Sequence, residues 1–157
     1  FGIGDYIILS SVEGTVEDIS FRSTRIRNAD NVVITIENSK VCAEYIQNAN
    51  QRTSRLWQFT LGLTYDTTEE KIRRVTQDLT QLLQSQPTVQ PNGVTVTLDK
   101  FNDYSLDILV RVYLTTLPYA EYLKERHRLN LLIMQTVKNA GCEFAFPTTT
   151  VEMAKGK

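Results

Sequence analysis

The hydrophobic periodicity of the chain changes near residue 50, and this change constrains the fold more than any other feature. Before it, apolar residues alternate over short stretches, such as residues 5–9 (DYIIL) and 32–36 (VVITI), as they do in half-buried strands. After it, alternating stretches are separated by segments with apolar residues every three to four positions, as in amphipathic helices. We therefore expect an all-β domain, a small barrel, over residues 1–50 and an α/β domain over residues 51–147.

The second domain shows a definite order of elements. The pattern predicts strands at 57–65, 94–98, 105–115 and 144–146, and helices at about 68–86 and 119–140. Thr67 and Glu70 form a capping-box pattern before the first helix, and Gly141 suits the left-handed position after the second. This β-α-β-β-α-β order is typical of a ferredoxin-like domain, with an antiparallel sheet covered by two helices on one face. Residues 148–157 are expected to form a C-terminal strand, at 149–153, and a tail; the strand has no partner in this chain.

One strand of the first domain carries several arginines. In residues 15–27 (TVEDISFRSTRIR), Ile19 and Phe21 alternate, but Ile26 lies on the opposite phase. We expect a single strand whose register slips near Ser23, through a bulge or a sharp bend of the kind that curls a sheet into a small barrel. Its arginines, Arg22, Arg25 and Arg27, could contact phosphates, although polar strand positions of this kind are more often simply solvated.

Composition argues against several classes of protein. The formal net charge is −1, whereas a nucleic-acid-binding domain usually carries a basic excess. Cys42 and Cys142 are far apart without a CxxC spacing, so neither a zinc site nor a disulfide framework is expected, and no cofactor is predicted. Apolar runs are too short for a membrane span or a signal peptide. The abrupt start, FGIGD without an initiator Met, indicates a fragment of a longer protein.

No group of residues has the pattern of a catalytic site, so we do not expect an enzyme. His127 lies among charged residues that are typical of a solvated helix face, and alternation places Glu17 and Asp18 on opposite faces of their strand. Cys142 and Ser105 lack the sequence context of an activated nucleophile.

Five motifs, taken together, resemble the cytoplasmic region of the mechanosensitive channel of small conductance (MscS) family. They are FGIGDYI (1–7), EGTVEDISFRSTRIR (13–27), VVITIENS (32–39), YDT (65–67) and AGCEFAFPTTTV (140–151). The resemblance implies an Sm-like middle β domain followed by a ferredoxin-like domain, in a homoheptameric ring on the cytoplasmic side of the cell (inner) membrane. Membrane helices upstream of Phe1 would form the pore, ions and small solutes would pass through side portals, and residues 149–153 would join an intermolecular barrel.

The resemblance also implies roles for particular residues. Ser23, Thr24, Arg25 and Asn38 would lie near contacts between subunits of the β ring, and Arg52 and Arg55 in the polar connector would line a portal. The chain departs from the family at Glu37, where many relatives have proline in an IPN motif, and at Cys142, where an aliphatic residue is common.

A second class of function stays open from the residues alone. An Sm-like barrel joined to a ferredoxin-like domain could be a soluble oligomeric module that binds RNA or a small effector, because both folds host many functions.

Overall fold

A computed structural model of the chain describes residues 1–147 and divides it into two compact units. Unit 1 spans Phe1–Thr53, and unit 2 begins at Ser54. Both contain antiparallel sheets, and unit 2 adds two long helices, so the chain is a mixed α/β protein.

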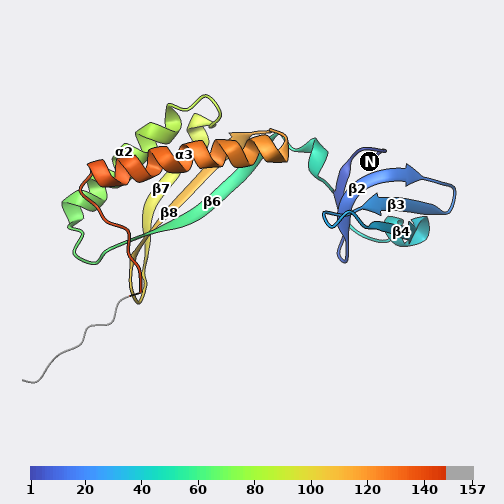
Figure 1. The fold of residues 1–157 in the computed structure, drawn as a ribbon, viewed down its shortest axis with the longest axis horizontal. Coiled ribbons are helices and arrows are strands. Elements are labelled where there is room, and N and C mark those ends of the chain that lie inside the picture. Colours follow the sequence, from blue (N-terminus) through green and yellow to red (C-terminus); the bar gives the residue numbers. More distant parts are fainter. Residues whose placement is uncertain (148–157) are drawn as a thin grey trace, which may run out of the picture. The chain divides into compact units, whose positions relative to one another are not determined.

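Unit 1 is built around a five-stranded antiparallel sheet with the order β4-β3-β2-β1-β5 (Figure 1). Its elements are β1 (Tyr6–Ile8), β2 (Glu13–Ile19), β3 (Ser23–Arg27), β4 (Val33–Glu37), the short helix α1 (Asn38–Cys42), β5 (Gln47–Asn48) and a 3-10 turn, η1 (Ala49–Gln51). Ile7, Leu9, Val16, Ile26 and Val41 form its buried core. Neither α1 nor β5 was expected from the sequence, because both are too short to show a periodicity.

The prediction of one bent strand over residues 15–27 is wrong. The chain instead turns back at residues 20–22 and forms an antiparallel hairpin, in which Ile19 of β2 pairs with Thr24 of β3. The change of phase between Phe21 and Ile26 reflects this turn, and β3 itself pairs with β4 without interruption.

A bulge does occur in this hairpin, but in β2 rather than near Ser23. The register shifts between Val16 and Asp18, so Glu17 is the extra residue. The strict alternation of side chains fails at such a bulge. As a result, Glu17 and Asp18 both reach arginines of β3, which corrects the expectation that they point to opposite faces.

Unit 2 is a sheet of strand order β6-β8-β7 with both long helices on the same side of it (Figure 1). Its elements are β6 (Ser54–Leu63), α2 (Glu69–Gln84), η2 (Pro91–Gly93), β7 (Thr95–Phe101), β8 (Leu106–Thr115) and α3 (Tyr119–Asn139). Fully buried side chains from α2, β8 and α3 fill the space between layers: Leu79, Leu83, Ile108, Leu114, Leu129 and Ile133.

The ends of the helices differ in part from the sequence expectation. Thr68, not Thr67, caps α2, and its hydroxyl accepts a hydrogen bond from the Lys71 amide at 3.3 Å. Thr67 is occupied elsewhere, because its hydroxyl donates to the Thr64 carbonyl at 2.6 Å. Gly141 has the expected left-handed conformation, with φ of 75°.

The predicted last strand, residues 144–146, is reduced to a single bridge between Phe144 and Leu63. Amide–carbonyl bonds from Thr64 to Glu143 and from Ala145 to Gly62 hold it beside β6. Residues 148–157, including the strand expected at 149–153, lie outside the described residues.

Candidate functional site

The turn between β2 and β3 is held by one side chain from a distant part of unit 1. Asn38 accepts a hydrogen bond from the Thr24 hydroxyl at 2.7 Å and donates to the carbonyl oxygens of Ser20 at 2.9 Å and Phe21 at 3.3 Å. Its backbone amide donates to the Arg22 carbonyl at 2.8 Å. Thr24 is only 1% exposed, so its hydroxyl depends on Asn38 for an acceptor.

This turn presents an apolar side chain to the outside. Phe21 is 96% exposed although it lies among residues that are hydrogen-bonded to Asn38. Ser20 and Ser23 tighten the turn further, since the Ser23 amide donates to the Ser20 hydroxyl at 3.2 Å. The turn is therefore an ordered protrusion.

The arginines of β3 are ion-paired. Arg25 lies 3.3 Å from Asp18, and Arg27 binds Glu17 and also the Asn31 carbonyl. The hydrogen bond from Arg27 lowers the pKa of Glu17, and the same contact raises the pKa of Arg27. Within residues 1–147, Arg22 has no comparable acidic partner.

The two arginines of the connector lie in different units. Arg52 is exposed and follows η1 in unit 1, where its amide donates to the Ala49 carbonyl. Arg55 is the second residue of β6 in unit 2, and its guanidinium carbon lies 4.3 Å from the centre of the Tyr122 ring and 5.4 Å from that of Tyr119. Arg55 is thus held against aromatic rings by cation–π contacts.

Arg55 belongs to a cluster of arginines and aromatic rings that the sequence pattern does not predict. Arg126 lies 5.6 Å from the rings of both Trp57 and Tyr122. Its Nε is buried and has no hydrogen-bond partner among the described residues, and its guanidinium lies within cation–π distance of both rings. The only sequence signal was the spacing of Tyr122 and Arg126, which places them on one helix face.

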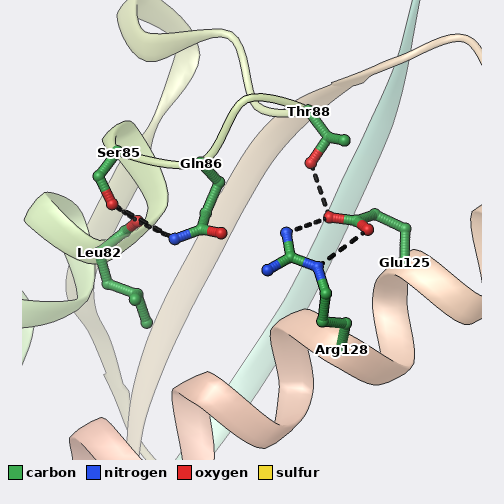
Figure 2. A network of polar contacts seen from close by, with 6 residues as sticks. All are labelled: Leu82, Ser85, Gln86, Thr88, Glu125 and Arg128. Carbon is green, nitrogen blue, oxygen red and sulfur yellow. Dashed lines mark hydrogen bonds and ion pairs between the residues drawn. The ribbon is translucent and has the colours of Figure 1, made fainter.

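A polar network joins α3 to the segment after α2, as Figure 2 shows. Glu125 accepts hydrogen bonds from the Thr88 hydroxyl at 2.7 Å and from Arg128. The Arg128 contact is the main reason why the pKa of Glu125 is lowered. His127 is exposed, as expected for a solvated face, but the Glu125 side chain is only 14% exposed and links two elements.

The described residues contain little that could support chemistry. Cys142 is buried, which raises the pKa of its thiol, and the Ser105 hydroxyl donates to Asp107 at 2.6 Å. Among residues 1–147, no group of three or more His, Cys, Asp or Glu side chains could hold a metal ion.

In the same part of the chain, no helix combines the length and the apolar character that a membrane span requires.

Comparison with protein families decides what these units are. The model described as "Mechanosensitive ion channel, beta-domain" matches residues 1–51, and "Mechanosensitive ion channel MscS, C-terminal" matches residues 58–144. The chain belongs to the MscS family of mechanosensitive ion channels. This is a family of channels rather than of enzymes, and nothing in the comparisons supports the RNA-binding alternative.

Curated members of the MscS family resemble the chain over nearly all of its length. The large-conductance mechanosensitive channel MscMJLR of Methanocaldococcus jannaschii is 37% identical over 99% of this chain and 44% of its own length. The low conductance mechanosensitive channel YnaI of Escherichia coli is 31% identical over 98% of this chain and 45% of its own length. The chain thus spans less than half the length of these relatives.

Solved structures of two other proteins share the fold. Arabidopsis thaliana MSL1 superimposes with a TM-score of 0.86 at 20% identity, covering 95% of this chain and 53% of MSL1. Helicobacter pylori MscS in its closed state gives a TM-score of 0.81 at 21% identity, covering 99% of this chain and 60% of that protein.

Proposed function

We propose that this chain is the cytoplasmic region of a tension-gated channel that releases ions and small solutes on hypo-osmotic shock. The observation that carries the proposal is the succession of the two family matches, which together cover residues 1–51 and 58–144 in the order expected for a channel of this family. Relatives named as mechanosensitive channels align with the chain over nearly its whole length. The pore would then be formed by membrane helices upstream of Phe1.

We further propose that unit 1 is an Sm-like β domain and unit 2 a ferredoxin-like domain, with boundaries near 1–50, 51–147 and 148–157. The five-stranded antiparallel sheet of unit 1, with its bulge in β2, suits a small curled barrel. In unit 2, the bridge at Phe144 lies beside β6, so the order Phe144-β6-β8-β7 follows the split βαβ arrangement.

The functional assembly in this proposal is a homoheptameric ring at the cytoplasmic side of the cell membrane. Ser23, Thr24, Arg25 and Asn38 would act close to subunit contacts. Within the chain, Thr24 and Asn38 bind each other, so their contribution to such a contact would be to shape the turn, while Arg25 remains exposed beside Asp18.

Arg52 and Arg55 are proposed to line a portal that biases which ions enter. A positive constriction favours anions, so replacing both arginines with Gln should shift the reversal potential of the full-length channel toward cation preference. Arg73→Gln, an exposed arginine of α2, is the matched control. An unchanged reversal potential in the double variant would remove both residues from the portal.

The function itself is tested by the survival of cells after a sudden fall in osmolarity. The full-length gene is expressed in a bacterial host whose own mechanosensitive channels have been deleted. We expect survival to rise well above that of the empty vector, with solute release during the shock. Unchanged survival, with the protein present in the membrane at the level of a working channel, would overturn the proposal.

A further inference from the structure

Unit 1 carries a protrusion and a hollow at opposite ends of its sheet. The protrusion is the β2–β3 turn with Phe21 and Arg22, both exposed. The hollow has a volume of about 420 Å³ and lies between the β1–β2 turn and the β3–β4 turn, with lining residues that include Leu9, Val12 and Ala29. The register places them apart, because Ile19 pairs with Thr24 near the protrusion, whereas Thr15 pairs with Arg27 near the hollow.

The charges of the two ends are complementary. Glu13 and Asp30 are exposed at the hollow, and neither carboxylate forms an ion pair within residues 1–147. Arg22, beside Phe21, is likewise without an acidic partner there. Arg27, the arginine closest in sequence to the hollow, is already bound to Glu17 and Asn31. An unpaired cation at one end thus matches two unpaired carboxylates at the other.

The protrusion is also prepared for binding. The hydrogen bonds of Asn38 to the carbonyl oxygens of Ser20 and Phe21 order the turn before any contact is made. Little conformational entropy is then lost when the turn docks. An exposed aromatic residue next to an arginine has the composition of an interface anchor.

We propose that Phe21 and Arg22 of one copy of this chain dock in the hollow of a second copy, with Phe21 against its apolar wall and Arg22 beside Glu13 and Asp30. The same copy cannot make this contact, because the five residues of β3 alone separate the two ends by about 16 Å. A contact between different surfaces of identical subunits is head-to-tail and closes into a ring when the rotation permits. The inference rests on the proposed homo-oligomeric channel and names the contact that builds it.

Cysteine cross-linking in the full-length channel tests this contact. Arg22→Cys and Asp30→Cys are combined in a background where Cys42, which is exposed, and any upstream cysteines are replaced by Ser. Phe21 is kept as the anchor. Because a disulfide needs Cα atoms within about 7 Å, a bond between these positions must join two copies.

Oxidation in membranes should give a ladder of covalent multimers with the double variant, and only monomers with each single variant. The mass of the unoxidised channel, measured in detergent, tests separately whether the channel is an oligomer and whether it is built by this docking contact. An oligomer that gives no ladder overturns the docking contact and leaves the channel proposal standing, whereas a monomer overturns the ring itself. Dimers from Arg22→Cys alone would show tip-to-tip contact and would also overturn the inference.

Charge reversal gives an independent readout. Arg22→Glu should reduce the fraction of assembled channel at least several-fold, and Asp30→Arg in the same chain should restore it. Asp99→Arg, at an exposed carboxylate of unit 2, is the matched control and should not restore assembly. Equal rescue by both second changes would show a nonspecific charge effect and would contradict the contact.

Discussion

Replacement of Asn38 by Ala is the most informative perturbation of unit 1. The change removes the acceptor for the Thr24 hydroxyl, at 2.7 Å, and the donor for the carbonyl oxygens of Ser20 and Phe21. The amide bond from residue 38 to the Arg22 carbonyl does not need the side chain and should persist. The hairpin turn should therefore loosen without the loss of the fold.

The size of the effect follows from the burial of these groups. The carbonyls of Ser20 and Phe21 belong to exposed residues and can bind water, so their bonds contribute about 0.5–1.5 kcal/mol each. The Thr24 hydroxyl is different, because a residue that is 1% exposed finds no water, and an unsatisfied buried hydroxyl costs about 1–3 kcal/mol. Simple addition of these contributions gives about 2–6 kcal/mol. Because neighbouring contributions are not fully additive, Asn38→Ala should destabilise unit 1 by about 2–4 kcal/mol, in the lower part of that range.

Native-state hydrogen exchange measures this cost where it arises. Amides in peptides from β2 and β3 that exchange through the opening of unit 1 should exchange roughly 30-fold to 900-fold faster in the variant. Asn92→Ala, at an exposed position of η2, is the matched control. It should change the free energy of opening, as measured by exchange, by no more than about 0.5 kcal/mol in either unit.

A double-mutant cycle tests the assigned cause. Thr24→Val removes the hydroxyl that Asn38→Ala would strand, so Asn38→Ala should cost at least about 1 kcal/mol less in that background. Additive effects of the two changes, or an Asn38→Ala cost no larger than that of the control, would refute the reasoning.

Three further predictions concern other sites. A Cβ on Gly14 would overlap the Arg27 carbonyl and the Ile26 side chain, so Gly14→Ala should lower the stability of unit 1 by at least about 1–3 kcal/mol. Gly2→Ala is the control and should be tolerated, because a Cβ there would meet open space. Hydrogen exchange of the β2 amides measures both variants. The pKa of Glu125 is lowered below its ordinary value of 4.5. The ionised carboxylate therefore contributes fully to the stability of the fold above that value, and this contribution is lost as the pH falls through the lower folded pKa. Wild type and Glu125→Gln should therefore differ less in their free energy of unfolding as the pH falls. Unfolding is followed by the fluorescence of the single tryptophan, Trp57, and a pH-independent difference would contradict this prediction. Iodoacetamide should modify exposed Cys42 at least tenfold faster than buried Cys142, whose thiol pKa is raised; equal rates by mass spectrometry would show that Cys142 is accessible.

Elements with a strong local pattern were predictable from the sequence. Nearly every residue of β8 is apolar or buried, and α3 buries Leu129, Ile133 and Val137 at helical spacing, so both were expected close to their observed bounds. The amphipathic pattern is a local property of these segments and survives folding.

The parts that failed depend on residues distant in sequence. The turn at residues 20–22 contains neither Gly nor Pro, and Asn38 from the start of α1 stabilises it. The choice between Thr67 and Thr68 as cap is decided by the bond of Thr67 to Thr64, which the capping-box pattern does not include.

In the candidate site, too, features that depend on residues distant in sequence were not predictable. The family could be inferred from the motifs. Alternation places the exposed Phe21 in a continuous strand, where the structure has a turn. The Arg55–Tyr122–Arg126 cluster joins β6 to α3 across more than sixty residues of sequence. Only the tertiary structure brings these groups together.

A patch-clamp recording under a suction ramp tests most directly whether this chain forms part of a channel opened by membrane tension. The full-length protein, reconstituted in liposomes without other channels, should open in discrete steps at a reproducible tension and close when suction is released. Patches that contain the protein but stay silent up to the tension at which the membrane ruptures would contradict the account.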